Sequence, residues 1–321
     1  MAMLVFPGQG SQKPGMGKFL FENFGLAKEC FDEGSEALKL DLKQLCFNAS
    51  ESDLALTENT QPALLVTSTA TQKVLRSEFG VQPSMSAGHS VGEYAALVAA
   101  GVLDFAAAIR AVRIRGQAMQ SAVPTGKGGM AALMGLEPQQ AEELCAFVEK
   151  RSGKSPLSPA NFNCPGQIVV SGAAPAIEWL RTEFKVENLW GETGPTRVKV
   201  IPLQVSAPFH CAMMKPAEEK MREVLSAIPF KNADFGIIQN FQALVETQAE
   251  QLKENLIRQI SAPVRWTQSM QEAQKLGFTQ IIECGGGKVL AGLLKKISPD
   301  FQVYSTNSLD DLKLIESLAI V

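Results

Sequence analysis

The stretch PSMSAGHSVGEYAALVAAG, residues 83–101, joins a short apolar strand, a tight turn and an alanine-rich helix. At its centre is a G-x-S-x-G pattern, in which Ser90 stands between Gly88 and Gly92. Small residues two before and two after a serine let the chain bend sharply from strand to helix. A serine at such a bend lies at a helix N-terminus, where N–H groups stabilise an oxyanion. The pattern also fits a serine that only caps the helix, so the rest of the chain must decide.

Helix-like and strand-like segments alternate along most of the chain. The apolar run MLVF (3–6) predicts a strand, and a helical pattern follows around residues 18–40. Gly101 ends the helix that follows Ser90, and Asp104 opens a long amphipathic helix. This alternation predicts an α/β fold with a hydrolase-like core and a mainly parallel sheet.

The middle of the chain has a different order of elements. Between residues 128 and 203 the pattern predicts strand, helix, strand, strand, helix and strand. This is the βαββαβ order of a ferredoxin-like unit. We therefore expect residues 128–203 to form an inserted ferredoxin-like subdomain, and residues 1–127 and 204–321 to form the core that carries the site.

Composition excludes several classes of protein. Hydrophobic residues make up 45% of the chain, and a net charge of −3 gives no overall field to attract nucleic acid. The six cysteines form no C-x-x-C pair, which argues against a zinc cage or a disulfide framework. No window reaches the roughly 18 apolar residues of a membrane span, and the N-terminus is too weakly apolar for a signal peptide. We expect a cytoplasmic monomer with no metal, nucleic-acid or membrane partner.

Only two histidines, His89 and His210, are available to activate a serine. Neighbouring side chains at a sharp turn usually diverge, so His89 is poorly placed to take a proton from Ser90. His210 lies in VSAPFHC, a loop after the last strand of the predicted subdomain, and is the better candidate. No Asp or Glu stands out as the third member of a triad, and a carbonyl group could orient the imidazole instead.

Arg115 is an independent indication of function. Helical periodicity places it in the middle of an apolar stripe with Ala108, Val112 and Met119. A buried guanidinium needs an anionic partner. That partner is either an internal Asp or Glu or a substrate carboxylate held by two hydrogen bonds.

Two glycine-rich loops do not fit nucleotide-binding motifs. PGQGSQKPG (7–15) has Lys13 where G-x-G-x-x-G needs its third glycine. ECGGGKVL (283–290) lacks the first glycine of a P-loop and the Ser or Thr after its lysine. Both stretches fit tight turns, and the pair Lys295 and Lys296 fits a solvated helix end.

Eight stretches together resemble the malonyl-CoA:acyl carrier protein transacylases of bacterial fatty-acid synthesis. They are FPGQGSQ (6–12), TQPAL (60–64), GHSVGEYAAL (88–97), RGQAMQ (115–120), NFNCPGQIVVSG (161–172), FHCAMM (209–214), PVRW (263–266) and ECGGGKVL (283–290). They occur in the family's order along nearly the whole chain, which makes the resemblance specific.

The resemblance implies catalytic roles for matching residues. Ser90 would carry the acyl group as an ester, and His210 would act as its general base. The backbone N–H groups of Gln9 and Val91 would form the oxyanion hole. The backbone carbonyl of Gln259 would orient His210, which accounts for the missing triad carboxylate.

Substrate recognition is implied in the same way. Arg115 would bind the free malonyl carboxylate, and Phe209 matches relatives that favour malonyl over branched groups. The implied reaction is a two-step exchange, in which Ser90 takes the malonyl group from malonyl-CoA and the phosphopantetheine thiol of acyl carrier protein then accepts it. The chain itself would bind no cofactor. An acidic carrier would require a local basic patch on a protein of net charge −3.

Two departures and two alternatives accompany this interpretation. Residues 184–197 are longer and more polar than usual, and Gly286 stands where the family usually has proline. One alternative is a serine thioesterase or esterase, although the chain has no Asp-Gly pair of a patatin-like dyad and no histidine after His210. The other is a non-catalytic module that binds acyl carrier protein.

Overall fold

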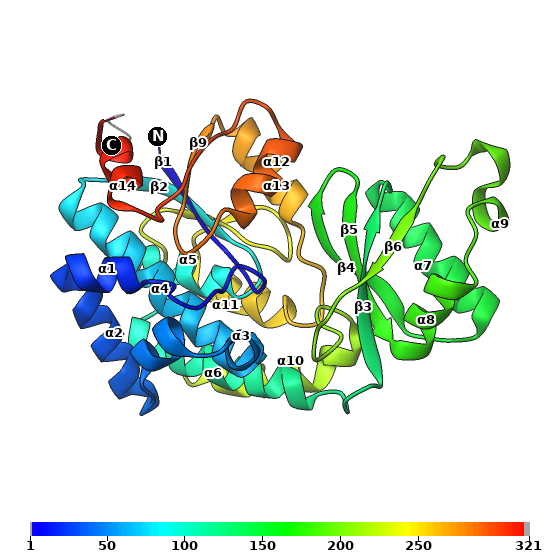
Figure 1. Ribbon diagram of the computed structural model, residues 1–321, viewed down its shortest axis with the longest axis horizontal. Coiled ribbons are helices and arrows are strands. Elements are labelled where there is room, and N and C mark those ends of the chain that lie inside the picture. The colour runs from blue at the N-terminus through cyan, green and yellow to red at the C-terminus, as the bar shows by residue number, and fades with distance from the viewer. Residues whose placement is uncertain (1, 318–321) are drawn as a thin grey trace.

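The first strand, β1 (Ala2–Phe6), lies inside a six-stranded sheet in the computed structural model, which describes residues 2–317 (Figure 1). The strand order is β10-β9-β1-β2-β7-β8, and all neighbouring pairs are parallel except β7 and β8. The other strands are β2 (Pro83–Gly88), β7 (Gly236–Ile238), β8 (Val245–Glu246), β9 (Gln280–Glu283) and β10 (Gln302–Tyr304). The predicted α/β core with a mainly parallel sheet is confirmed.

Side chains of β1 alternate between two hydrophobic cores, one on each face of the sheet. Leu4 and Phe6 belong to the larger core, whereas Met3 and Val5 belong to the smaller one. The larger core is built with α1 (Lys18–Asn23), α2 (Gly25–Leu38), α3 (Glu51–Ala55), α4 (Thr57–Glu78), α5 (Gly92–Ala99), α6 (Phe105–Ser121), α10 (Lys215–Ser226), α11 (Ala249–Arg258) and α14 (Leu309–Ser317). The smaller core is built with α12 (Trp266–Lys275) and α13 (Val289–Ile297). The sheet is therefore buried on both faces, as parallel sheets usually are.

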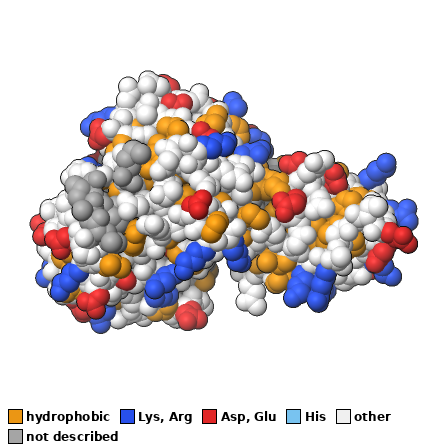
Figure 2. Space-filling view, turned by 90° about the horizontal axis from the view of Figure 1, so that it is seen from above, with side chains coloured by type: hydrophobic (Ala, Val, Ile, Leu, Met, Phe, Trp, Pro, Cys, Tyr) orange, Lys and Arg blue, Asp and Glu red, His pale blue; other side chains and the backbone are white. Residues whose placement is uncertain are grey.

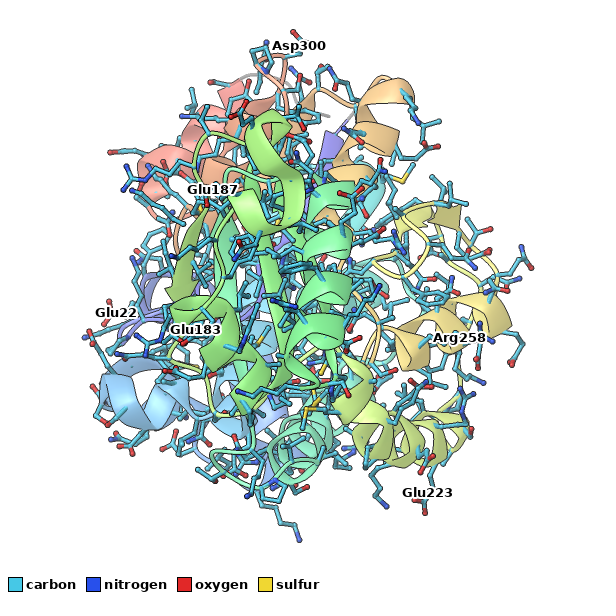
Figure 3. All side chains as sticks on the ribbon, turned by 90° about the vertical axis from the view of Figure 1, so that its right-hand side faces the viewer. Glu22, Glu183, Glu187, Glu223, Arg258 and Asp300 are labelled. Carbon is cyan, nitrogen blue, oxygen red and sulfur yellow. The ribbon has the colours of Figure 1, made fainter. Side chains whose placement is uncertain are left out.

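A second sheet of four antiparallel strands forms the narrower lobe. It has the order β4-β5-β3-β6, with β3 (Gly128–Met134), β4 (Leu157–Cys164), β5 (Gln167–Ala173) and β6 (Lys199–Pro202). Two helices, α7 (Pro138–Ser152) and α8 (Ala174–Thr182), pack on one face and lie toward the viewer in Figure 3. The predicted βαββαβ order is confirmed. Whether residues 128–203 form a separate folding unit stays a prediction.

The other face of the small sheet packs against the core. Met130, Ala132 and Val169 belong to the same hydrophobic cluster as the large sheet's helices. The backbone continues this contact, because Phe162 donates to the carbonyl of Val264 at 2.9 Å. Seen from above, the two lobes meet at a waist that is indented on one side (Figure 2).

Several elements differ from the sequence expectation. The helix expected at residues 18–40 is two helices, because Phe24 is extended and packs its ring edge-on against Phe19 and Phe79. The short strands β7, β8 and β10 were not part of the expectation. The polar stretch 184–197 forms the short helix α9 (Glu187–Trp190) and a 3-10 turn, at the end of the narrow lobe.

All six cysteines are buried and unpaired. Burial raises the pKa of every one of these thiols. Within residues 2–317, no helix is long and apolar enough to cross a membrane. In the same part of the chain, no three His, Cys, Asp or Glu side chains are grouped as a metal site would require.

Candidate active site

Ser90 lies in the turn between β2 and α5 with a φ of 53°. This left-handed conformation is uncommon for a residue with a Cβ atom and marks a strained turn. The flanking glycines are required by close contacts. A Cβ atom on Gly88 would lie 2.0 Å from the carbonyl carbon of Gly92, and one on Gly92 would lie 2.1 Å from the carbonyl oxygen of Phe6. The G-x-S-x-G pattern therefore forms the predicted sharp turn.

His210 reaches Ser90 from the loop that follows the small sheet. Its Nε2 lies 2.8 Å from Ser90 Oγ, and its Nδ1 lies 2.9 Å from the carbonyl oxygen of Gln259. When Nδ1–H donates to that carbonyl, Nε2 is free to accept the serine proton. Burial and the charge of Arg115 lower the pKa of His210 to about 3, so the imidazole is neutral near neutral pH.

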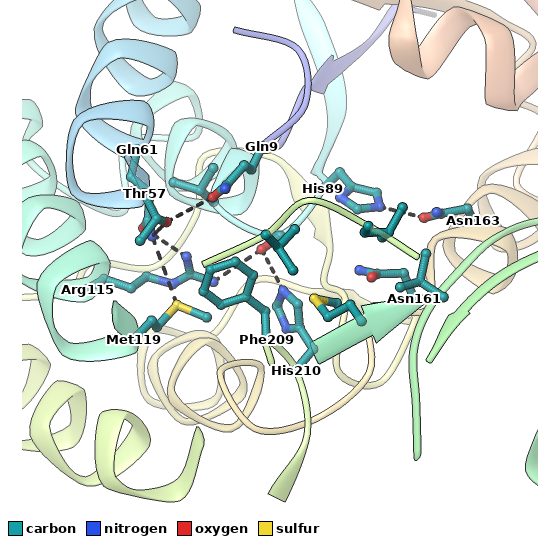
Figure 4. A pocket seen from close by; sticks show the side chains of 16 residues that line it. Gln9, Thr57, Gln61, His89, Arg115, Met119, Asn161, Asn163, Phe209 and His210 are labelled. Atoms are coloured by element: carbon teal, nitrogen blue, oxygen red, sulfur yellow. Dashed lines mark hydrogen bonds between the residues drawn. The ribbon is translucent and has the colours of Figure 1, made fainter. Parts of the chain in front are cut away.

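His89 has a different partner. Its Nε2 lies 2.9 Å from Asn163 Oδ1 on β4 (Figure 4). Its ring centroid lies 5.6 Å from that of Trp266. Burial lowers its pKa as well. Of the two histidines, only His210 is hydrogen bonded to Ser90.

Arg115 projects from α6 into the same site and is 1% exposed. Its guanidinium donates to Gln61 Oε1 at 2.8 Å, Gln259 Oε1 at 3.0 Å and Ser90 Oγ at 3.2 Å. None of the ion pairs within residues 2–317 involves Arg115. No carboxylate of the described residues lies within ion-pair distance of Arg115, and the buried carboxyl of Glu93 acts on it only at longer range. The cation is therefore open to an anionic ligand.

Backbone donors suited to an oxyanion lie at the ends of two neighbouring strands. The N–H of Ser90 itself is occupied, because it donates to Asn240 Oδ1 at 2.7 Å. Among the hydrogen bonds of residues 2–317, the backbone N–H groups of Gln9 and Val91 have no acceptor. The side chain of Gln9 is turned to Thr57, whose hydroxyl donates to Gln9 Oε1 at 2.8 Å. Gln9 and Val91 line the same cavity as Ser90, so these two unpaired N–H groups are candidates to stabilise a negative charge there.

These groups border a cavity of about 180 Å³ between the core and the small sheet (Figure 4). The polar groups Ser90, His210 and Arg115 line this cavity. Its apolar lining includes Met119, Met130, Val169, Leu203, Val205 and Phe209. Pockets for drug-sized ligands have volumes of about 300–1,000 Å³, so this cavity suits a short acyl group.

Three further residues of the site were not identified from the sequence. Gln61 lies within the stretch TQPAL, yet no periodicity indicates that its amide would face Arg115. Asn163 contacts His89 only because the small sheet packs on the core. Asn240 follows the carboxyl end of β7, which is the edge of a parallel sheet where sites usually form. A prediction of β7 would have provided that signal.

An α/β core with a serine–histidine pair at the carboxyl edge of its sheet defines the class of serine-dependent acyl-transfer and hydrolytic proteins. The model of one family, the acyl transferase domain, matches residues 3–296. The chain is 44% identical over 310 residues to the malonyl CoA-acyl carrier protein transacylase of Bacillus subtilis (strain 168), covering 97% of this chain and 94% of the relative. A transacylase of the same name from Staphylococcus aureus (strain MW2) is 41% identical, with 97% and 96% covered.

Solved structures agree with these relatives. An acyl carrier protein S-malonyltransferase from Vibrio cholerae has a TM-score of 0.90 at 41% identity, covering 98% of this chain and 99% of that one. A malonyl-transacylase in complex with a type II PKS acyl-carrier protein also has a TM-score of 0.90, at 39% identity and 99% coverage of both chains. The chain belongs to the malonyl CoA-acyl carrier protein transacylases and is an acyltransferase.

Proposed function

We propose that this chain transfers the malonyl group of malonyl-CoA to the phosphopantetheine thiol of acyl carrier protein, through a malonyl ester on Ser90. The observation that carries this proposal is the chain of hydrogen bonds from Ser90 Oγ to His210 and on to the carbonyl of Gln259. In this arrangement a neutral imidazole accepts the serine proton, and the backbone carbonyl does the orienting work of a triad carboxylate.

The first half-reaction forms the ester. Ser90 Oγ attacks the thioester carbonyl carbon while its proton moves to His210 Nε2. The N–H groups of Gln9 and Val91 stabilise the oxyanion of the tetrahedral intermediate. The carbon–sulfur bond then breaks, and CoA leaves as a thiol with the proton from His210.

The second half-reaction reverses these roles. The phosphopantetheine thiol gives its proton to His210 and attacks the ester carbonyl, and Ser90 Oγ leaves with that proton. The proposal requires no resident cofactor or metal, since phosphopantetheine comes with the carrier. It treats the chain as a cytoplasmic monomer.

Arg115 is the residue expected to select a malonyl group over an uncharged acyl group. A malonyl group bound as an ester at Ser90 ends in a carboxylate, and the guanidinium hydrogen bonded to Ser90 Oγ is the nearest buried cation. The carboxylate would pair with it bidentately and replace contacts now made to glutamine and serine oxygens. The apolar side chain of Phe209 would limit the space for branches on the acyl group.

The direct test is incubation of the protein with malonyl-CoA, followed by intact mass measurement and peptide mapping. We expect one malonyl group, on Ser90, and release of one CoA per chain before any carrier protein is added. The variant Ser90→Ala is the control and should remain unmodified. A folded protein that forms no adduct would reject the proposal and favour a carrier-binding module. Rapid release of free malonate without carrier would favour a thioesterase.

A further inference from the structure

The conformation of Ser90 has to be held by its surroundings. A non-glycine residue in the left-handed region costs about 1–3 kcal/mol and persists only where neighbouring contacts fix it. The turn lies between β2 and α5, and its own glycines only permit the bend. Besides backbone hydrogen bonds within the turn and to β1, side-chain contacts to the turn come from the segment that follows β7.

Asn240, at the carboxyl end of β7, binds the turn at two points. Its side-chain oxygen accepts from the N–H of Ser90 at 2.7 Å, and its side-chain amide donates to the carbonyl of Gly88 at 2.6 Å. Asn240 is fully buried, so water does not compete for either hydrogen bond. One planar amide thus spans the residues on either side of the bend.

Asn240 is itself fixed in place by buried polar groups. Its backbone N–H donates to one carboxylate oxygen of Glu93 at 2.7 Å, and Gln239 donates to the other at 3.0 Å. Glu93 lies in the first turn of α5, directly after the bend. The side-chain amide of Gln259 donates to Asn240 Oδ1 at 3.3 Å and to the carbonyl of Ser90 at 3.0 Å. The contacts close a ring between β2, α5 and β7.

We propose that Asn240 is a positioning residue for acyl transfer. It holds Ser90 in the conformation that directs Oγ to His210, and it removes the N–H of Ser90 from the donors available to an oxyanion. The N–H groups of Gln9 and Val91 are then the two that remain. This inference rests on the proposed function.

Asn240 is expected to affect the rate of acylation and not the affinity for malonyl-CoA. Asn240 is not among the residues that line the cavity, whereas Arg115 is. Loss of the Asn240 side chain therefore removes no group that lines the cavity, and its main effect is on the alignment of the nucleophile. A misplacement of about 1 Å can slow a reaction about 10²-fold.

The test compares single-turnover acylation by malonyl-CoA in the wild type, Asn240→Ala and Asn240→Asp. We expect Asn240→Ala to lower the acylation rate about 10²-fold and to leave KM for malonyl-CoA unchanged. The control Ser35→Ala removes a side chain that also donates to one backbone carbonyl and accepts from one N–H, but on α2. It should acylate at the wild-type rate.

Asn240→Asp provides a signature that general destabilisation would not produce. A protonated aspartic acid has both a donor for Gly88 and an acceptor for Ser90, whereas the carboxylate lacks the donor. The rate of this variant, divided by the wild-type rate, should therefore rise as pH falls from 8 to 5.5. Glu93, Arg115 and His210 surround this position in both proteins, and burial raises the pKa of Glu93 to about 7. The ratio is therefore also measured in a Glu93→Gln background, where a remaining pH dependence belongs to the new carboxyl group.

Two results would overturn the inference. One is a folded Asn240→Ala variant that acylates at the wild-type rate, or one in which only KM for malonyl-CoA is raised. The other is an Asn240→Asp variant whose rate ratio does not change with pH, and this measurement decides alone if the alanine variant does not fold. A wild-type protein that forms no ester would reject the proposed function instead, because that failure does not involve Asn240.

Discussion

At the scale of single residues, the site combines a neutral histidine with a buried arginine that forms no ion pair within residues 2–317. His210 is neutral because burial and Arg115 lower its pKa to about 3, so its Nε2 holds no proton near neutral pH when Nδ1–H donates to Gln259. Arg115 is buried, lies beyond ion-pair distance of any carboxylate in the described part of the chain, and lines the cavity. Burial is the main cause of the neutral imidazole and the charge of Arg115 adds to it, and in the proposed reaction the same cation would attract an anionic acyl group.

Arg115→Ala tests the recognition of the acyl group. Hydrogen bonds to charged groups contribute about 1.5–3 kcal/mol, so kcat/KM for malonyl-CoA should fall about 10- to 150-fold. Transfer of an uncharged acetyl group should improve relative to wild type, since no buried cation then faces the methyl group. Steady-state assays with both thioesters would measure the two effects.

The matched control is Arg113→Ala on the same helix, where the guanidinium is partly exposed and pairs with Glu58 at 3.3 Å. This control should leave the ratio of malonyl to acetyl transfer unchanged. An equal loss on both substrates in Arg115→Ala would instead indicate that Arg115 only supports the fold of the site.

At the scale of elements, three parallel strands deliver the site's polar groups to one edge of the sheet. Gln9 follows β1, Ser90 follows β2 and Asn240 follows β7. The carboxyl ends of parallel strands meet at that edge, which is where α/β proteins usually bind ligands. The small sheet closes the cavity from the other side with Met130 and Val169.

Alanine substitutions at Gly92 in α5 and Gly292 in α13 should have opposite effects on the stability of the protein. Gly92→Ala should prevent the close approach of α5 to β1, because the new Cβ would overlap the carbonyl oxygen of Phe6. We expect a loss of about 2–4 kcal/mol in the free energy of unfolding, together with loss of acylation. Gly292→Ala lies in the exposed middle of α13 with no atom within 4 Å and should stabilise the protein by up to about 1 kcal/mol.

Urea denaturation of both variants would measure these changes. A Gly92→Ala variant as stable and active as the wild type would show that the turn tolerates a larger residue. Gly292→Ala is the control. If it stabilises the protein while Gly92→Ala destabilises it, the loss of stability in Gly92→Ala arises from the contact at Gly92 and not from alanine substitution in general.

The elements differ in how well the sequence predicted them. The turn at Ser90 and the cap at Asp104 could be predicted because each depends on a few adjacent residues, and Asp104 does accept from the N–H of Ala107. The βαββαβ order was also predictable from alternating patterns. β7 was not, because three residues are too few to show a period, and Asn240 was missed with it.

Within the site, the limit of prediction was different. His210 and Arg115 could be identified because each residue was rare or placed against its local pattern. The amides of Gln61 and Gln259 could not be identified in this way, because glutamine is common on helix surfaces. Their contacts to Arg115 arise only when α4, α6 and the end of α11 pack together.

At the scale of the whole molecule, the buried histidine links the site to stability. The folded protein keeps His210 neutral, whereas the unfolded chain binds a proton near the ordinary pKa of 6.5. The unfolded state therefore gains stability as pH falls below 6.5, until the folded form also binds the proton near pH 3. Between pH 7 and pH 5 this lowers the free energy of unfolding by about 2 kcal/mol.

His210→Gln tests this linkage. The difference in the free energy of unfolding between the variant and the wild type should change by about 2 kcal/mol in favour of the variant from pH 7 to pH 5. Urea denaturation at several pH values would measure it. Ser90→Ala keeps the buried imidazole and should follow the wild type. A difference that stays constant with pH would show that His210 has the same pKa in the folded and unfolded states.

The burial of all six cysteines has a consequence for the fate of the acyl group. Thiolates attack esters readily, and a reactive thiol near Ser90 would capture the malonyl group within the same chain. Cys211 is next to His210 in the sequence, but its sulfur is directed to the carbonyl of Pro208 at 3.2 Å, and burial raises its pKa. The other five thiols are equally inaccessible. In the proposed reaction these thiols would not compete for the malonyl group, and the accepting sulfur would arrive from another molecule.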